Sequence, residues 1–225
     1  MNTDRSLWNE VDSYFAGTLV RADDALDAAL AASAAAGLPA ISVSTCQGKM
    51  LYLLAQMQRA RHILEIGTLG GYSAIWLARA LPPGGTLVTL EASAKHADVA
   101  RENIARAGLA GIVDLRVGAA LDTLPHLAAE GLPPFDFTFI DADKASNAEY
   151  FAWALKLSRK GSVIVVDNVV RGGTVIDANS DDAGTRGVRR LTALVAATPG
   201  VSATTVQTVG AKGYDGFMLV RVDGG

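Results

Sequence analysis

The sequence predicts an α/β fold built on one mostly parallel β-sheet with helices on both of its faces. Short, almost entirely apolar segments alternate with helical segments from residue 61 onward. Several of these apolar segments end in a glycine or an acidic residue. Uninterrupted apolar strands that alternate with helices are typical of a parallel sheet buried on both faces. The last two strands are expected to form a hairpin, which adds one antiparallel strand.

The composition indicates a single globular domain. The chain has 225 residues, of which 50% are hydrophobic and 19% charged, which is typical of a folded domain rather than a disordered chain. The formal net charge is −3 and no strongly basic stretch is present, so we expect no nucleic-acid partner. The only cysteine, Cys46, cannot form an internal disulfide, which fits a reducing compartment.

The sequence shows neither a secretory signal nor a membrane span. Its N-terminus is polar, and no apolar run reaches the ~18 residues that a transmembrane helix requires. We therefore expect a cytoplasmic protein that does not associate with membranes.

The N-terminal part is expected to be helical. Residues 7–36 have the pattern of two helices, and Leu26 and Leu30 lie one turn apart in the second. A turn and a further helix over 47–58 follow. Within one domain, 1–225, we distinguish an N-terminal helical segment, 1–40, from a catalytic α/β core, 41–225. The sequence leaves open whether residues 1–40 cover the substrate or form a dimer contact.

The elements of the core follow in order, each bounded by glycine, proline or polar residues. The expected parallel strands cover residues 63–66, 86–90, 112–117, 135–140 and 162–166. The expected helices cover residues 71–80, 95–107, 121–129, 147–157 and 188–197. The hairpin strands cover 202–209 and 217–222, separated by a loop over 210–216. The polar segment 169–187 is expected to be a mobile loop above the substrate.

A glycine-rich turn, Gly67-Thr68-Leu69-Gly70-Gly71-Tyr72-Ser73, follows the first strand. A dinucleotide site would require Gly-x-Gly-x-x-Gly, but Leu69 stands at the second glycine position. Glu65 would also bring negative charge close to a pyrophosphate. A cationic cofactor without phosphate, such as S-adenosylmethionine, suits the turn better. A purely structural turn is the alternative.

Glu91 ends the second strand, where an acidic residue can accept both hydroxyls of a ribose. This signal does not separate NAD from S-adenosylmethionine. The alternative interpretation is an exposed acid near a helix N-terminus.

Two neighbouring strands end in oxygen-bearing side chains. One ends in Asp141-Ala142-Asp143-Lys144 and the other in Asp167-Asn168. If the strands run in sequence order, Asp141, Asp167 and Asn168 converge as three hard oxygen ligands. Such ligands suit Mg²⁺ best, with Mn²⁺ or Ca²⁺ as alternatives, and do not suit Zn²⁺. Loop-capping aspartates are the alternative. The three histidines lie outside this cluster and are expected at the surface or at a boundary: His62, His96 and His126.

At these residues the chain resembles the metal-dependent O-methyltransferases of the catechol and caffeoyl-CoA type, from about residue 42 to residue 222. The matching motifs are Leu64-Glu65-Ile66-Gly67-Thr68, Gly71-Tyr72-Ser73, Phe139-Ile140-Asp141-Ala142-Asp143-Lys144, Asp167-Asn168 and Gly213-Tyr214-Asp215-Gly216. The resemblance implies a Rossmann-like class I methyltransferase fold. This fold has a seven-stranded sheet with the last strand antiparallel, and its members are usually homodimers.

The resemblance also implies roles for individual residues. The implied cofactor contacts are Val43, Glu65, Gly67, Thr68, Ser73, Glu91, Ala120, Asp141 and Asp143. Among them, Glu91 would bind the ribose, Ala120 would lie by the adenine and Asp143 near the amino group. The implied metal ligands are Asp141, Asp167 and Asn168, and Lys144 would be the general base.

Three departures from the family pattern stand out, of which the first would remove a side-chain hydroxyl contact to the cofactor and the last two bear on the substrate. Leu69-Gly70 stands where relatives often have an aromatic residue and a hydroxyl residue, and Ser146-Asn147 stands where they often have Asn-Tyr. Gly172 replaces an asparagine that plant relatives use near the substrate. Caffeoyl-CoA itself is therefore not the expected acceptor.

The sequence thus predicts an O-methyltransferase that depends on S-adenosylmethionine and a divalent cation and acts on a small phenolic molecule with two adjacent hydroxyls. Two alternatives remain at this point. A nucleotide-dependent oxidoreductase would bind a nicotinamide and has no use for Asp167-Asn168. A non-catalytic protein of the same fold has no need of Lys144 and three metal ligands.

Overall fold

The sheet has seven strands in the order β3-β2-β1-β4-β5-β7-β6. The computed structural model describes residues 2–21 and 23–224, with side chains from residue 5 onward. The strands are β1 (His62–Ile66), β2 (Thr86–Glu91), β3 (Val113–Val117), β4 (Phe135–Ile140), β5 (Ser158–Asp167), β6 (Val201–Gly210) and β7 (Gly213–Val222). Strands β1 to β5 pair in parallel, whereas β7 is antiparallel to both of its neighbours. The predicted fold class, with an antiparallel last strand, is confirmed.

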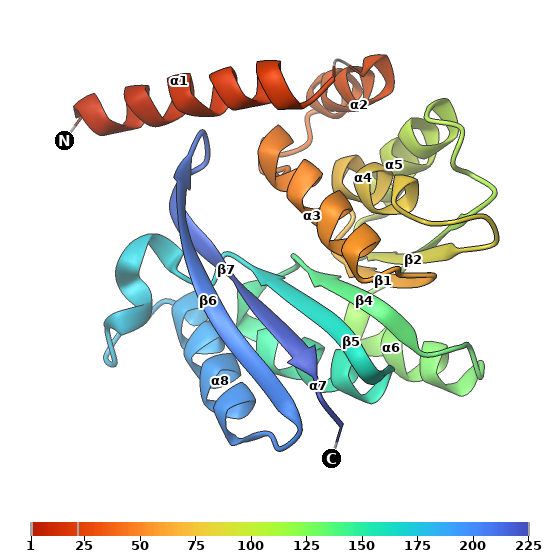
Figure 1. The fold of residues 1–225 in the computed structure, drawn as a ribbon, viewed down its shortest axis with the longest axis vertical. Coiled ribbons are helices and arrows are strands. Elements are labelled where there is room, and N and C mark those ends of the chain that lie inside the picture. The colour runs from red at the N-terminus through yellow and green to blue at the C-terminus, as the bar shows by residue number, and fades with distance from the viewer. Residues whose placement is uncertain (1, 22, 225) are drawn as a thin grey trace.

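Helices cover both faces of the sheet (Figure 1). The α-helices are α1 (Asn2–Leu19), α2 (Asp24–Ala35), α3 (Thr45–Met57), α4 (Tyr72–Arg79), α5 (Ala94–Arg106), α6 (Ala120–Ala129), α7 (Asn147–Lys156) and α8 (Ala183–Ala197). Two short 3₁₀ helices, η1 (Lys144–Ser146) and η2 (Arg171–Ile176), follow the ends of β4 and β5. Helices α3, α4 and α5 pack on one face and α6, α7 and α8 on the other.

The two faces hold two separate hydrophobic cores. In β1, Ile63 contributes to the core beneath α3, α4 and α5, whereas Leu64 and Ile66 contribute to the opposite core. All three side chains are fully buried. Because successive strand residues point to opposite faces, both faces of this strand must be apolar. This explains the uninterrupted apolar strands of the sequence.

Helix α1 lies across the tip of the β6–β7 hairpin, far from its own position in sequence (Figure 1). Asp12 accepts a hydrogen bond from the backbone N–H of Ala211 at 2.8 Å. Helix α2 instead packs against α4 and α5. Asp23 caps the N-terminus of α2 and forms an ion pair with Arg79 of α4. The segment 1–40 therefore contains two helices that pack on different parts of the core.

The boundaries of two predicted loops are wrong. Within the predicted mobile loop 169–187, residues 171–176 form η2 and α8 begins at Ala183, where Asp182 accepts the backbone N–H of Thr185. The hairpin loop is only Ala211-Lys212, because main-chain pairing continues to Gly210 and Gly213. Both errors arise because backbone hydrogen bonds and caps need no apolar residues, so an apolar pattern does not reveal them.

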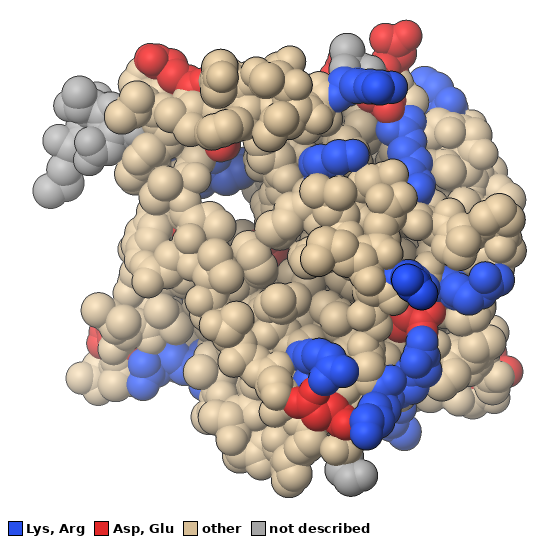
Figure 2. Space-filling view, in the orientation of Figure 1, with Lys and Arg blue, Asp and Glu red and all other residues tan. Residues whose placement is uncertain are grey.

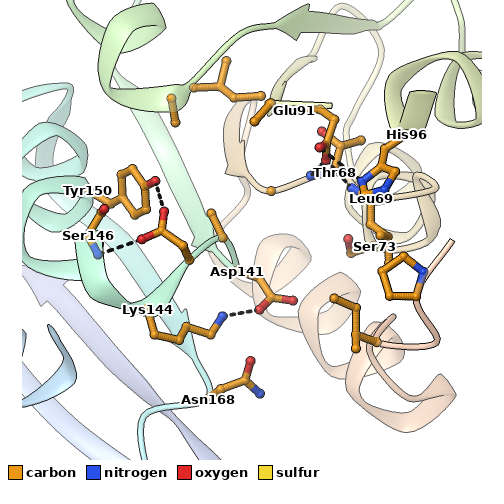
Figure 3. A pocket seen from close by; sticks show the side chains of 18 of the residues that line it. Thr68, Leu69, Ser73, Glu91, His96, Asp141, Lys144, Ser146, Tyr150 and Asn168 are labelled. Atoms are coloured by element: carbon orange, nitrogen blue, oxygen red, sulfur yellow. Dashed lines mark hydrogen bonds and ion pairs between the residues drawn. The ribbon is translucent and has the colours of Figure 1, made fainter. Parts of the chain in front are cut away.

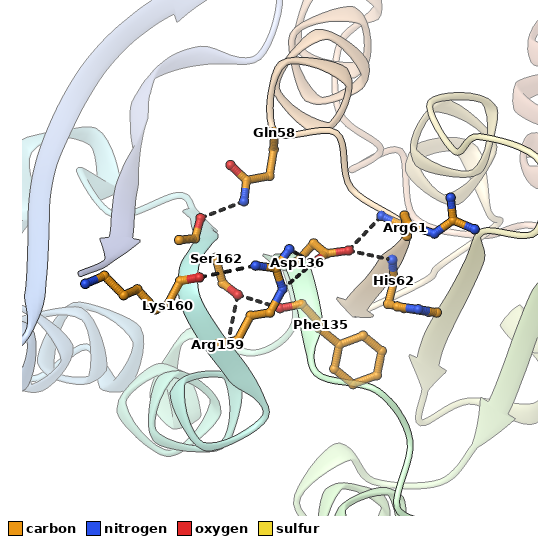
Figure 4. Close-up of polar contacts among 9 residues, drawn as sticks. Gln58, Arg61, His62, Phe135, Asp136, Arg159, Lys160 and Ser162 are labelled. Atoms are coloured by element: carbon orange, nitrogen blue, oxygen red, sulfur yellow. Dashed lines mark hydrogen bonds and ion pairs between the residues drawn. The ribbon is translucent and has the colours of Figure 1, made fainter. Parts of the chain in front are cut away.

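A polar cluster joins β1, β4 and β5 at the end of the sheet opposite to the acidic strand ends (Figure 4). Buried Asp136 accepts the backbone N–H groups of Arg61 at 2.7 Å and His62 at 3.0 Å, and it pairs with Arg159 at 2.6 Å. Ser162 donates to the carbonyl of Phe135 at 2.7 Å, where the register between β4 and β5 shifts. This irregularity lets β5 begin four residues before the apolar run that the sequence reveals.

Of the helices described, none has the length and apolar character needed to span a membrane.

Candidate active site

The ends of β1, β2, β4 and β5 meet at one edge of the sheet and surround a cavity of about 720 Å³. This volume is typical of a pocket for a small molecule or cofactor. Its lining includes Val43, Gly67, Thr68, Ser73, Glu91, Ala120, Asp141, Asp143, Lys144 and Asn168. In Figure 3, Glu91 and His96 lie on one side, Lys144 and Tyr150 on the other, and Asp141 between them. We call this the cofactor cavity.

Gly67 brings the end of β1 close to the end of β4. Its φ of +102° lies in a region that other residues rarely adopt. A Cβ at this position would lie 2.5 Å from the carbonyl oxygen of Asp141. Only glycine therefore allows the two strand ends to approach this closely.

Glu91 holds the loop that follows Gly67. Its Oε2 accepts the backbone N–H of Leu69 at 2.7 Å and that of Thr68 at 3.3 Å. Its Oε1 accepts the N–H of Ser93 at 2.9 Å and lies 3.4 Å from Nδ1 of His96. The carboxylate lines the cofactor cavity, and of its about four lone-pair sites one, on Oε1, is left without a backbone partner and can accept a ligand hydroxyl.

Glu65 is fully buried behind the cavity wall. Its Oε2 accepts a hydrogen bond from Thr89 at 2.5 Å, whereas Oε1 has no partner among the described residues. Burial raises the pKa of Glu65 to about 8, although the hydroxyls of Ser73 and Thr89 oppose the rise. A buried carboxylate oxygen without a partner is costly, so a cationic ligand group at this position would be stabilised.

Asp143 is held on the far side of the cavity. It accepts hydrogen bonds from the hydroxyl of Tyr150 and from the backbone N–H of Ser146, the latter at 3.0 Å. Burial by itself would raise the pKa of Asp143, but these hydrogen bonds outweigh burial and hold it below its ordinary value. Burial and the contact with Asp143 raise the pKa of Tyr150. Asp143 is therefore ionised at neutral pH.

Half-buried Asp141 and buried Asp167 are two acids at neighbouring strand ends. Nζ of Lys144 donates to Oδ1 of Asp141 at 2.6 Å. Burial raises the pKa of Asp141, although the charge of Lys144 opposes the rise. Burial raises the pKa of Asp167 to about 7, and the negative charge of Asp141 adds to this rise. Two acids and one ammonium leave an excess of negative charge that favours a further cation.

Asn168 follows Asp167 with a left-handed backbone, φ +56°. Its side chain lies near the Lys144–Asp141 pair (Figure 3). Within the described part of the chain, no three His, Cys, Asp or Glu side chains are placed to share a metal ion. The predicted ligand set contains only two carboxylates, and its third expected donor is the amide oxygen of Asn168.

A second cavity, of about 620 Å³, lies on the other side of Asn168. Asp167, Asn168 and Arg171 line it together with residues of α1, α3 and the β6–β7 hairpin. Figure 2 shows a hollow under α1, between the hairpin and α3. We call this the acceptor cavity. Val43, Asn168 and Arg171 line both cavities, so the two spaces adjoin at the predicted metal site.

The structure brings most predicted site residues to the cofactor cavity. Glu65 lies behind its wall, and Asp167 lines only the acceptor cavity. The sequence analysis did not identify Gln47, whose Nε2 donates to Oδ2 of Asp167 at 2.7 Å, or Tyr150. His96 is half-buried, as expected of a boundary residue, but the sequence analysis did not anticipate that it lines the cofactor cavity. The one feature of the sequence that could have placed His96 near the cavity was its position five residues after Glu91.

The chain matches the O-methyltransferase family over residues 20–222. It is 54% identical to a catechol O-methyltransferase of Niastella koreensis, over 96% of this chain and 98% of that one. It is 56% identical to a catechol O-methyltransferase of Mycobacterium tuberculosis, over 95% of each chain. An O-methyltransferase from Bacillus cereus, solved in complex with SAH, superimposes with a TM-score of 0.96 at 58% identity, over 96% of this chain and 99% of that one.

These matches extend over both faces of the sheet and over the acidic strand ends, and they exclude the oxidoreductase that the glycine-rich turn left open. The chain belongs to the O-methyltransferase family and is an enzyme of that class.

Proposed function

We propose that this enzyme transfers the methyl group of S-adenosylmethionine to one hydroxyl of a vicinal dihydroxy aromatic, with a divalent cation bound by Asp141, Asp167 and Asn168. One observation carries the proposal. Lys144 and the three oxygen-bearing side chains stand where two cavities adjoin, and each cavity has the size of a small-molecule site. The names of the relatives and the SAH complex of the Bacillus cereus enzyme support the same assignment.

The residues of the cofactor cavity fit S-adenosylmethionine. Oε1 of buried Glu65, which has no partner among the described residues, suits an ammonium group, and Oε1 of Glu91 has one lone pair left for a ribose hydroxyl. Loop residues Gly67 and Thr68 close the wall between these two acids. We assign the methionine part to the side of Glu65 and Ser73, and the adenosine part to the side of Glu91 and Ala120.

The oxygen-bearing side chains of Asp141, Asp167 and Asn168, where the two cavities adjoin, fit a hard divalent cation. Two carboxylates and one amide oxygen suit Mg²⁺, with Mn²⁺ and Ca²⁺ as alternatives. The raised pKa values of Asp141 and Asp167 reflect the mutual repulsion and burial that such a cation would relieve. When bound, the cation supplies Lewis acidity, which makes an acceptor hydroxyl easier to deprotonate.

Lys144 is placed to accept the proton of that hydroxyl. In the structure its ammonium is held by Asp141. Lys144 and the proposed cation would share this carboxylate, which would place the amine close to the acceptor hydroxyl whose proton it takes. The deprotonated oxygen then attacks the methyl carbon, and the carbon–sulfur bond breaks. Holding both reactants in adjoining cavities lowers the entropic cost of their encounter.

A metal-exchange experiment and two lysine variants test this function. With catechol as acceptor, chelator should abolish methylation and added Mg²⁺ should restore it. Lys144→Arg keeps a cation beside Asp141 but removes the base, so we expect turnover to fall roughly 10²–10⁴-fold with SAH binding retained. Lys156→Ala, on the exposed side of α7, is the control. Full activity in chelator contradicts the metal, and full activity of Lys144→Arg contradicts the base.

We also propose that the enzyme is a homodimer. The described part of α1 exposes apolar side chains in a pattern that a monomer has no reason to maintain: Leu7, Val11, Tyr14, Phe15 and Leu19. Val206, Val209 and Tyr214 of the adjacent hairpin are also exposed. Figure 2 shows few charged side chains over α1 and this hairpin. A second copy covering this surface would bury these side chains.

A further inference from the structure

The acceptor cavity carries basic side chains that the proposed chemistry does not use. Arg171, Lys212 and Arg5 line it. Neither Arg171 nor Lys212 forms an ion pair with an acid among the described residues. Unpaired cations beside a cavity are typical of a site for an anionic group.

The acids of the same cavity are already engaged elsewhere. Asp12 accepts the N–H of Ala211, and Oδ1 of Asp215 accepts the N–H groups of Val170 at 3.0 Å and Arg171 at 2.9 Å. Asp167 accepts from Gln47 and from its neighbour's backbone. These carboxylates fix loops and the proposed metal, so they do not neutralise the basic side chains by direct contact.

Arg171 is held in an unusual position. Its backbone is left-handed, φ +57°, and the hydrogen bond to Asp215 fixes it there. Its Nε is buried and has no hydrogen-bond partner in the described part of the chain. The guanidinium packs beside Gly184, where a Cβ would lie 3.2 Å from Nη2. Nearby Asp182 uses its Oδ2 to cap α8 through Thr185. Together with the hydrogen bond from Thr185, the charge of Arg171 lowers the pKa of Asp182, so the guanidinium lies between the N-terminal turn of α8 and the two cavities that Arg171 lines.

Lys212 approaches the same cavity from the hairpin turn. Its Nζ donates to the carbonyl of Ala40 at 3.0 Å, which leaves two of its three donors free. It lines the acceptor cavity, and its positive charge opposes the rise in the pKa of Asp141. Arg171 lies three residues after Asn168, and both line the two cavities. The two cations therefore flank the place where a metal-bound ring would lie.

We propose that Arg171 and Lys212 form a carboxylate subsite, and that the preferred acceptor is a dihydroxy aromatic with a carboxylate on its ring or on a short side chain. This inference rests on the proposed function, because it locates the carboxylate relative to the two hydroxyls. Arg171 supplies the directional donors through its guanidinium, and Lys212 supplies charge from the opposite wall.

Three acceptors of similar size test the subsite. Protocatechuate is anionic, its primary amide is neutral and dopamine is cationic. For the wild type with Mg²⁺, we expect kcat/KM to be roughly tenfold higher for protocatechuate than for the amide, and lowest for dopamine. Arg171→Gln should reduce the acid-to-amide ratio about tenfold, and Lys212→Gln should reduce it by a smaller factor. Comparing ratios between variants cancels the electronic difference between the two rings.

Arg101→Gln is the matched control, because it removes an exposed arginine on α5 that lines neither cavity. Binding of the acid and the amide to SAH- and Mg²⁺-loaded protein, measured by calorimetry, gives a second readout without turnover. If the wild type binds the acid more tightly than the amide and Arg171→Gln loses this preference, the subsite is supported. If no acceptor is methylated at the same time, only the proposed function is refuted. An equal acid-to-amide ratio in wild type and both variants overturns the subsite. If Arg171→Gln unfolds, Lys212→Gln and Arg171→Lys decide by the same ratio.

Discussion

Glu65 shows how a single residue links cofactor binding to stability. Its folded pKa of about 8 lies above its ordinary value of 4.5, because burial disfavours the charged form. Between these values the folded state keeps a proton that the unfolded state has released. The free energy of unfolding therefore falls as pH rises through this window, and levels off above about pH 8.

The change Glu65→Gln should remove this pH dependence. Relative to the wild type without cofactor, the variant should become more stable between pH 5 and pH 8, as followed by thermal unfolding. It should also weaken SAH binding by tenfold or more, because an ammonium loses a charged partner. Asp141 and Asp167 remain in both proteins, so the difference isolates Glu65. Glu102→Gln, at an exposed position on α5, is the control. If the stability of Glu65→Gln depended on pH in the same way as that of the wild type, the raised pKa of Glu65 would be contradicted.

Three non-glycine residues near the cavities have left-handed backbones: Leu69, Asn168 and Arg171. Such conformations cost on the order of 1–3 kcal/mol each and persist only where the surroundings impose them. Glu91 accepts the N–H of Leu69, and Asp215 accepts that of Arg171. The acids at the strand ends thus orient the loops as well as the ligands.

At the scale of elements, close packing between η1 and α8 positions Lys144. A Cβ on Gly187 of α8 would lie 2.0 Å from the carbonyl oxygen of Lys144 and 2.7 Å from Cα of Ala145. Both atoms belong to the backbone, so they cannot move without displacing η1. Helix α8 thus packs directly against η1, the short helix that carries the proposed base Lys144.

The change Gly187→Ala should destabilise the protein by about 1–3 kcal/mol through overpacking. Because η1 must shift, turnover should fall more than SAH affinity does. Gly17→Ala in α1 is a sharp control, since nothing lies within 4 Å of the added Cβ. Loss of glycine from a helix interior should raise stability there by about 0.5–1 kcal/mol. Thermal unfolding that ranks the two variants the other way would contradict this packing argument.

The prediction of elements was most accurate for the apolar strands and least accurate for polar segments. The strand over 135–140 matches β4 at both ends, because every one of its residues is buried. In contrast, β6 has nine residues that are exposed or half-buried and is held by main-chain pairing with β7. Side-chain patterns report burial, so they detect an element only to the extent that it contributes to the core.

At the scale of the whole molecule, the exposed face of α1 determines the expected assembly. Tyr14 is 66% exposed and Leu7 58% exposed, on a helix that reaches the acceptor cavity through Arg5 and Asp12. Dimerisation through this face would bring the second copy close to the entrance of that cavity. Substrate access and assembly would then depend on the same helix.

The wild type should elute as a dimer in size-exclusion chromatography with light scattering. The double change Leu7→Glu and Tyr14→Glu should give monomers, because burying two carboxylates in an apolar interface is costly. Leu132→Glu, at an exposed position away from α1, should leave the dimer intact. A monomeric wild type at micromolar concentration, or a dimeric double variant, would contradict this assignment.

The sequence by itself determined the fold class and predicted many of the residues that line the cofactor cavity, because apolar strands, glycine turns and acidic strand ends are local patterns with a fixed physical meaning. It also determined that Asp141 and Asp167-Asn168 lie at adjacent strand ends, since parallel strands in sequence order present their ends at one edge. The tertiary structure alone decided that Lys144 pairs with Asp141, that Oε1 of Glu65 lacks a partner among the described residues, and that η2 and the hairpin bring Arg171 and Lys212 to one acceptor cavity. Those contacts join segments far apart in the chain, and their energies come from burial and charge, which only the folded arrangement sets.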